Sequence, residues 1–175
     1  HAWKAVYISV NEPPREFLSR YCNYIETEES VVTTCDADIQ RRTSFFLDLD
    51  PIRDAHISAS NAEHAEALKL AEIIAHDLDT RGYPIPAMCD SGNGAHLVWA
   101  IELPGDDGGK VTSVLKGMAA LYADEARDRK IKIDASVGNA SRIIKLYGTQ
   151  TCKGSDTEER PHRMSRILSM PKEMQ

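Results

Sequence analysis

The chain has 175 residues, 42% of them hydrophobic and 27% charged, which is enough to bury the core of one globular domain and excludes a disordered or fibrous protein. No apolar run approaches the ~20 residues that cross a bilayer, and no leader-like segment opens the chain, so we expect a cytoplasmic protein with no membrane partner. The net charge of −6 does not indicate a nucleic-acid-binding protein, although residues 141–175 carry seven Lys/Arg against four Asp/Glu.

Strand and helix patterns alternate along the chain. Apolar alternation and turn signals predict strands over residues 3–10, 43–50, 85–89, 96–103, 131–133, 142–147 and 164–168. Helical spacing predicts helices over residues 15–25, from an N-cap at Asn61 to a stop at Gly82, and over 111–126. The apolar faces predicted for the two longer helices are Ala65, Leu68, Ala71, Ile74, Ala75 and Leu78, and Val114, Leu115, Met118, Leu121 and Tyr122. This mixture of elements predicts an α+β domain.

We expect residues 1–175 to form a single domain, because neither an internal repeat nor a low-complexity linker divides the sequence. The first residue is His1 rather than Met, so we expect the domain to be excised from a larger protein. The four cysteines have no C-x-x-C spacing, which argues against a zinc ribbon and predicts reduced, mostly buried thiols.

The most informative stretch of the chain is residues 45–51, FFLDLDP. Strand side chains alternate faces at ~3.3 Å per residue, so Asp48 and Asp50 project from one face about 6.6 Å apart at their backbones. The opposite face is apolar and can be buried. Two carboxylates this close repel each other unless cations neutralise them, and Pro51 ends the strand beside them. The stretch therefore predicts a metal-binding pair of acids at a strand end.

A Gly-rich hairpin turn formed by Ser91, Gly92, Asn93 and Gly94 stands just before His96. Glycines in such a turn let backbone N–H groups face outward and approach an anion, as in nest-type phosphate sites. An imidazole beside the turn can add a hydrogen bond to a triphosphate oxygen. Asn-Gly turns are also ordinary connectors, so the functional interpretation depends on the histidine as well as the turn.

A third carboxylate, Asp134, ends the strand predicted at 131–133. An Asp after a short strand is often a turn residue or a helix cap, and that alternative stays open. Three cations follow it, Arg142, Lys145 and Lys153. Cations behind an acid suit a site that holds metal ions and polyphosphate together, although they can equally form surface salt bridges.

The chain carries, in this order, Leu-Asp-Leu-Asp at 47–50, Ser-Gly-Asn-Gly-Ala-His at 91–96, Ile-Asp at 133–134 and Ser-Arg-Ile-Ile-Lys-Leu-Tyr-Gly-Thr at 141–149. Together these motifs resemble those of the archaeo-eukaryotic primase superfamily, and most closely the bifunctional primase-polymerase domains of mobile elements. The resemblance covers roughly residues 4–170. It implies a two-module fold whose catalytic half is similar to an RNA-recognition motif.

The resemblance also implies roles for individual residues. Asp48, Asp50 and Asp134 would be the catalytic acids and bind Mg²⁺ or Mn²⁺, and oxygen-only ligands suit these ions. Nucleotide binding would fall to His96, Ser91, Gly92, Asn93, Gly94, Arg142, Lys145 and Lys153. Strand alternation sends Arg142 and Lys145 to opposite faces, so we favour Arg142.

The implied activity is template-directed nucleotidyl transfer, as DNA primase, DNA polymerase or both. NTPs or dNTPs would be the substrates and single-stranded or primed nucleic acid the template, with a helicase or other domains in the parent protein.

Two other classes stay open. A phosphatase of the haloacid-dehalogenase type also carries Asp-x-Asp after an apolar strand, but its pattern continues with Thr or Val where this chain has Pro51 and Ile52. The non-enzymatic alternative is a catalytically inactive module of the same fold that binds nucleotide or nucleic acid.

Overall fold

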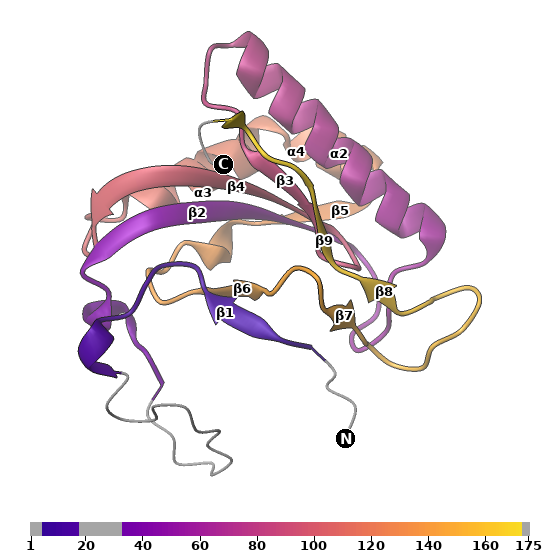
Figure 1. The fold of residues 1–175 in the computed structure, drawn as a ribbon. Helices are drawn as coiled ribbons and strands as arrows, with labels where there is room; N and C mark the ends of the chain where they lie inside the picture. Colours follow the sequence, from indigo (N-terminus) through magenta and orange to yellow (C-terminus); the bar gives the residue numbers. More distant parts are fainter. Residues whose placement is uncertain (1–4, 18–32, 173–175) are drawn as a thin grey trace.

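The computed structural model describes residues 5–17 and 33–172 (Figure 1). At its centre is a five-stranded sheet in which every neighbouring pair of strands is antiparallel. The strand order is β5 (Ile131–Asp134), β2 (Arg41–Pro51), β4 (Ala95–Pro104), β3 (Ala87–Asp90) and β9 (Arg166–Ser169). Helices and sheet form separate layers, which confirms the predicted α+β class, and the division into two modules stays a prediction.

Three helices cover one face of this sheet: α2 (Asn61–Thr80), α3 (Lys110–Leu121) and α4 (Ala123–Asp128) (Figure 1). Alternate strand residues point toward this face, and Leu47, Leu49 and Leu97 have no exposed surface there. Helix α2 adds Leu70 and Ile74, which are equally buried. Burying each such side chain stabilises the fold by roughly 1.5–3 kcal/mol relative to leaving it exposed.

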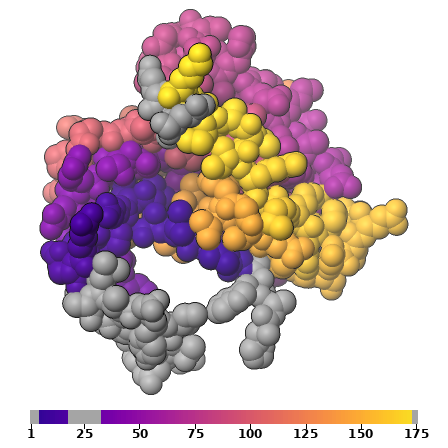
Figure 2. Space-filling model, in the orientation of Figure 1, coloured from indigo at the N-terminus to yellow at the C-terminus, as the bar shows by residue number. Residues whose placement is uncertain are grey.

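Two short strand pairs lie on the other side of the sheet. Strand β1 (Tyr7–Ser9) pairs with β6 (Ile143–Lys145), and β7 (Gln150–Thr151) pairs with β8 (Arg163–Met164). Ile144 is buried in the same hydrophobic core as Phe46 of β2, so the β1–β6 pair packs against the sheet. Figure 2 shows the yellow C-terminal segment crossing the front of the molecule toward α2, where β9 pairs with β3.

Short 3-10 helices η1 (Arg15–Phe17), η2 (Asp36–Asp38) and η3 (Ala135–Val137) complete the described part of the chain. None of the helices in these residues is long and apolar enough to cross a membrane.

The strands that carry the candidate site lie within one or two residues of their predicted ranges, and the hairpin that joins β3 to β4 is confirmed. The predicted N-cap of the long helix is wrong by one residue. Ser60 caps α2, because its hydroxyl accepts from the Glu63 N–H while the Glu63 side chain accepts from the Ser60 N–H.

The predicted helix faces are partly wrong. Ala65 is exposed, and Val114 and Leu121 keep 45% and 54% of their surface exposed. Ala67 and Val111 are buried instead. The helix predicted over 111–126 breaks at Tyr122, so α3 and α4 are separate. Alanines lie on more than one side of these helices, so the buried side is decided by contact with the sheet rather than by the apolar pattern.

The N-terminal predictions are tested over part of their range. The predicted strand at 3–10 is present as β1, and the predicted helix at 15–25 is described at its start, as η1, with residues 18–25 outside the described part. Among the cysteines, Cys89 is buried, Cys152 is half-buried and Cys35 is exposed, so the expectation of mostly buried thiols holds for Cys89 alone among those described.

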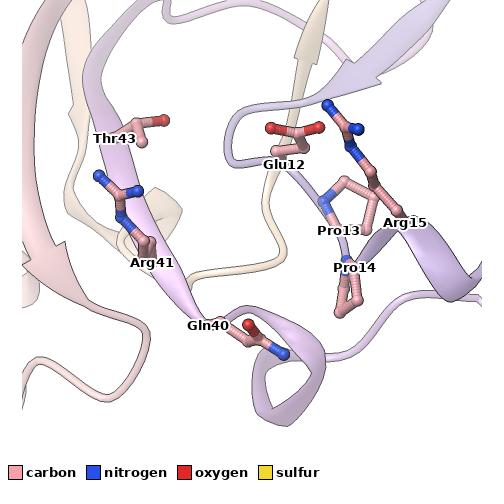
Figure 3. A pocket seen from close by; sticks show the side chains of 7 residues that line it. All are labelled: Glu12, Pro13, Pro14, Arg15, Gln40, Arg41 and Thr43. Carbon is pink, nitrogen blue, oxygen red and sulfur yellow. The ribbon is translucent and has the colours of Figure 1, made fainter.

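Near its start, strand β2 contains a β-bulge between Arg42 and Ser44. The Asn11 side chain holds it, since Asn11 Oδ1 accepts from the N–H groups of Thr43 and Ser44 at 2.9 and 3.1 Å. A pocket of about 210 Å³ lies beside the bulge. Figure 3 shows the side chains that line it: Glu12, Pro13, Pro14, Arg15, Gln40, Arg41 and Thr43. This pocket lies at the opposite end of β2 from the predicted acids and contains none of the predicted site residues.

Candidate active site

The register of the sheet brings two of the predicted acids and the predicted histidine side by side. Asp48 on β2 lies opposite Asp134 on β5 and opposite His96 on β4, and His96 lies opposite Cys89 on β3. Directly paired residues of antiparallel strands share a face, with Cβ atoms about 4.5–5.5 Å apart. Asp134, Asp48, His96 and Cys89 therefore form one row across four strands, which we call the polar row.

The apolar residues beside the row determine which way it faces. Leu47 and Leu49 flank Asp48 in sequence and are buried under the helices, so Asp48 must project from the opposite face. Asp50 projects from that face too and lies opposite Lys132 on β5. Pro51 is the last residue of β2, which places both acids near the strand end, as the sequence predicts.

Asp134 is the most extensively hydrogen-bonded acid of the row. Its Oδ1 accepts from the Ser136 hydroxyl at 2.6 Å and from the Ser136 N–H at 2.9 Å, and its Oδ2 lies 3.2 Å from Lys132 Nζ. Partial burial acts to raise the pKa of Asp134, but the bonds from Ser136 and Lys132 outweigh it and lower the pKa below 3.8. Asp134 is thus both the N-cap of η3 and a charged member of the row.

Asp50 is paired with a buried guanidinium. Arg53 Nη1 lies 3.1 Å from Asp50 Oδ1, and the Arg53 side chain is only 5% exposed. Two backbone carbonyls accept further hydrogen bonds from it, since Nη1 also donates to Pro51 O at 2.9 Å and Nε donates to Ile57 O at 3.1 Å. Arg53 therefore fixes the loop after β2 and neutralises Asp50 at the same time.

His96 lies between Asp48 and Tyr147, which is in the segment after β6. Its Nδ1 lies 2.8 Å from the Tyr147 hydroxyl, and its Nε2 lies 3.4 Å from Asp48 Oδ1. The ring is buried and tilts against Phe46, with centroids 5.1 Å apart. Tyr147 was not predicted as a site residue, because its partner lies 51 positions away in the sequence and no local pattern links them.

The turn at 91–94 lies beside the row, but it is not the open anion-binding loop that its glycines predict. The Gly92 N–H donates to Asp90 Oδ1 at 2.7 Å, and the Gly94 N–H donates to the Ser91 hydroxyl at 3.0 Å. Asn93 is buried, with its Oδ1 accepting from the Ala59 N–H at 2.8 Å. These contacts use donors that we expected to face a phosphate, so the turn positions its neighbours instead.

Glycine is required at position 94 because the turn lies directly on β2. A Cβ on Gly94 would collide with the Leu49 carbonyl oxygen and lie 3.2 Å from Asp50 Cα. At Gly92 the backbone has φ +91°, and a Cβ would meet Thr151 Oγ1 at 2.8 Å. The turn is thus wedged between β2 and β7.

A buried pair that the sequence did not predict holds the turn. His64 Nε2 of α2 lies 2.8 Å from Asp90 Oδ1, and Arg166 Nε lies 3.4 Å from Asp90 Oδ2. Burial acts to raise the pKa of Asp90, but the bonds from His64 and the Gly92 N–H outweigh it and lower the pKa below 3.8. The ionised carboxylate therefore ties α2 to the turn beside the row.

The three predicted cations occupy different environments. Lys145 is 3% exposed and its Nζ donates to Gln150 O at 2.8 Å, so it is not available to a phosphate as placed, contrary to the expectation. Burial also lowers the pKa of Lys145. Arg142 is half-buried, and its guanidinium makes no hydrogen bond or ion pair with any residue in the ranges 5–17 and 33–172.

Lys153 lines a pocket beside the acids. The pocket has a volume of about 270 Å³, and its lining combines Arg53, His56, Lys132 and Lys153 with the acids Asp50 and Asp54. Arg53 and Lys132 already pair with Asp50 and Asp134, so an anion there would depend on Lys153.

The three predicted acids fit a hard divalent cation, since Asp48, Asp50 and Asp134 offer only carboxylate oxygens. As placed, each acid has its own basic partner, and within the described ranges no three His, Cys, Asp or Glu side chains lie close enough to hold a metal ion. A cation at the row would therefore replace Lys132 as the partner of Asp134.

No protein-family model and no curated protein matches the sequence. Among solved structures, the chain is similar to the polymerase domain of Mycobacterium tuberculosis ligase D in complex with DNA, at 17% identity and TM-score 0.44 over 72% of this chain and 45% of that one. It is also similar to the AEP domain of the cyanophage S-2L primase-polymerase, at 19% identity and TM-score 0.38 over 77% of this chain and 55% of that one. The chain spans about half the length of these solved domains.

Proposed function

We propose that this chain is a template-directed nucleotidyltransferase, a DNA primase, a DNA polymerase or both, that joins NTPs or dNTPs. The observation that carries the proposal is the register of the sheet, which sets Asp134, Asp48 and His96 side by side on one face. Carboxylates can hold metal ions and an imidazole can contact a phosphate, so these groups can support phosphoryl transfer when they lie close together.

Asp48 and Asp134 would hold Mg²⁺ or Mn²⁺ between their strands, with Asp50 as a third ligand. When bound, such ions would help to activate the attacking 3′-hydroxyl and to stabilise the pyrophosphate leaving group. The residues of this chain orient those acids. Ser136 holds one oxygen of Asp134, and the turn at Gly94 supports the backbone of Asp50.

His96, Arg142 and Lys153 would bind the nucleotide. His96 stands next to Asp48, Arg142 has an unpaired guanidinium among the described residues, and Lys153 lines the basic pocket at the end of β2. Single-stranded or primed nucleic acid would be the template, and the buried Lys145 is left out of the binding set. Primase or polymerase activity would give the chain a role in DNA replication. A helicase would be a separate domain of the parent protein.

The test is primer extension by the wild-type chain with NTPs and dNTPs supplied separately, in Mg²⁺ and in Mn²⁺. Extension that is lost in Asp48→Ala and Asp134→Ala, and kept in Asp124→Ala on the exposed side of α4, is the expected result. Hydrolysis of a phosphate monoester without extension would indicate the phosphatase class. Nucleotide binding without incorporation under every condition would indicate an inactive binding module.

A further inference from the structure

The inner side of the polar row holds a hydrogen bond between Tyr147 and His96 that the proposed function does not use. Tyr147, just after β6, lies over His96 and Cys89, which are opposite each other in the sheet. The rings of Tyr147 and His96 meet edge to face, with centroids 5.9 Å apart and an interplanar angle of 62°. The Cys89 side chain also lies beside Tyr147, close enough to influence its pKa. Tyr147 thus contacts His96 and lies next to Cys89, while His96 faces Asp48.

The contact between His96 and Tyr147 can have either direction. The Tyr147 hydroxyl lies 2.8 Å from His96 Nδ1, and either group can donate, depending on the tautomer of His96. If Tyr147 donates, the single N–H of a neutral imidazole is on Nε2. Nε2 lies 3.4 Å from Asp48 Oδ1, and a carboxylate at that distance favours an N–H over a lone pair.

Tyr147 is suited to donate. Burial, followed by the neighbouring Cys89 and Asp48, raises the pKa of Tyr147 far above its ordinary value, so the phenol keeps its proton. The reverse arrangement would make Tyr147 accept from Nδ1 and give its proton to Cys89. Sulfur is a weak acceptor and an imidazole nitrogen a strong one, which disfavours the reverse direction.

We propose that Tyr147 is a positioning residue whose hydroxyl donates to His96 Nδ1 and so presents the Nε2–H to the Asp48 end of the site. There the Nε2–H is a fixed donor for a phosphate oxygen of the nucleotide, and this consequence rests on the proposed function. Without the hydroxyl, the imidazole is free to carry its proton on either nitrogen, and one of the two tautomers faces the phosphate with a lone pair.

The test combines nitrogen spectra with nucleotide titration. In protein labelled with ¹⁵N-histidine, the signals of His96 are identified by their absence in His96→Gln. The wild type should show the signature of the Nε2–H tautomer, and Tyr147→Phe should show a mixture of tautomers. Nucleotide affinity of Tyr147→Phe should fall about two- to tenfold, as expected for one hydrogen bond, with KM changing more than kcat.

Tyr122→Phe is the matched control. It removes a hydroxyl that is also hydrogen-bonded, to Asp77 Oδ2 at 2.7 Å, but on the helix side of the sheet. Its His96 signals and nucleotide affinity should equal those of the wild type. A wild-type His96 with the proton on Nδ1 or on both nitrogens, or unchanged signals or nucleotide affinity in Tyr147→Phe, would overturn the inference. If the wild type binds no nucleotide, the proposed function fails, and the spectra alone still decide the role of Tyr147.

Discussion

On the helix-covered face of the sheet, Leu47, Leu49 and Leu97 have no exposed surface, whereas on the other face the side chains of Asp48 and Asp134 keep 29% and 23% of theirs. Both faces are built from alternate residues of the same strands. A shift of one residue in strand pairing would therefore move the site residues to the core face and the core residues to the site face. The apolar face contributes stability. The polar face brings like charges together, which is unfavourable in the absence of cations. The comparison predicts that substitutions on the two faces have separable effects.

The largest effect should follow substitution of the acids on the polar face. Asp48→Asn and Asp134→Asn should each lower nucleotide incorporation by on the order of 10²–10³-fold, because each removes a charge that the transition state requires. The loss of stability should be smaller than the loss of activity, since Asn keeps the shape and still caps η3, and Asp134→Asn removes the charge that faces the exposed Lys132. Single-turnover primer extension and urea unfolding of the same samples measure the two effects. Loss of folding in step with activity would show that the faces are not separable.

On the apolar face the effect should be on stability. Leu49→Ala should lower the free energy of unfolding by about 2–5 kcal/mol, because it leaves a cavity under α2. At a temperature where the variant remains folded, its incorporation rate should stay close to that of the wild type. Urea unfolding gives the first quantity, and a change larger than tenfold in rate without unfolding would contradict the comparison.

Asp50 should combine both effects. Asp50→Ala leaves the buried Arg53 without its carboxylate, so we expect a loss of about 1–3 kcal/mol in unfolding free energy together with a loss of incorporation. Asp50→Asn keeps an acceptor for Arg53 and should recover most of the stability but not the activity. Equal stability of the Ala and Asn variants would mean that the Arg53 pair contributes nothing.

The smallest effect should appear as a change in the pH dependence of stability. The pKa of Asp90 is lower in the folded protein than its ordinary 3.8, so its contribution is present above that value and lost as pH falls through the folded pKa. Asp90→Asn should therefore be less stable than the wild type at pH 7, and the difference should shrink toward pH 2. Denaturant unfolding between pH 7 and pH 2 checks this, and a constant difference would contradict it.

Much of the site could be predicted from sequence because it follows from strand alternation. Leu47 and Leu49 must face one way, which sends Asp48 and Asp50 the other way. The register that sets Asp48 opposite both Asp134 and His96 could not be derived from alternation, since it depends on how strands far apart in the chain pair.

The errors have physical reasons too. Lys145 looked like a phosphate ligand, but a strand residue with a long stem can turn inward, and its Nζ meets a backbone carbonyl. The turn glycines indicated free amides, but Asp90 and the Ser91 hydroxyl occupy two of them. Tyr147 contacts His96, 51 positions away in the sequence, and His64 contacts Asp90, 26 positions away. No local sequence pattern predicts such pairs.

The most direct test of the polar row is Mn²⁺ binding, followed by the loss of the free-ion electron paramagnetic resonance signal as protein is added. The wild type should bind Mn²⁺, and the double variant Asp48→Asn/Asp134→Asn should lose at least tenfold in affinity, since both carboxylates are removed from the ion. The matched control is Asp124→Asn/Asp128→Asn, which neutralises two acids of α4 whose side chains are 85% and 77% exposed, and it should bind like the wild type. Wild-type affinity in the Asp48/Asp134 double variant would contradict the account, because the ion would then be bound elsewhere.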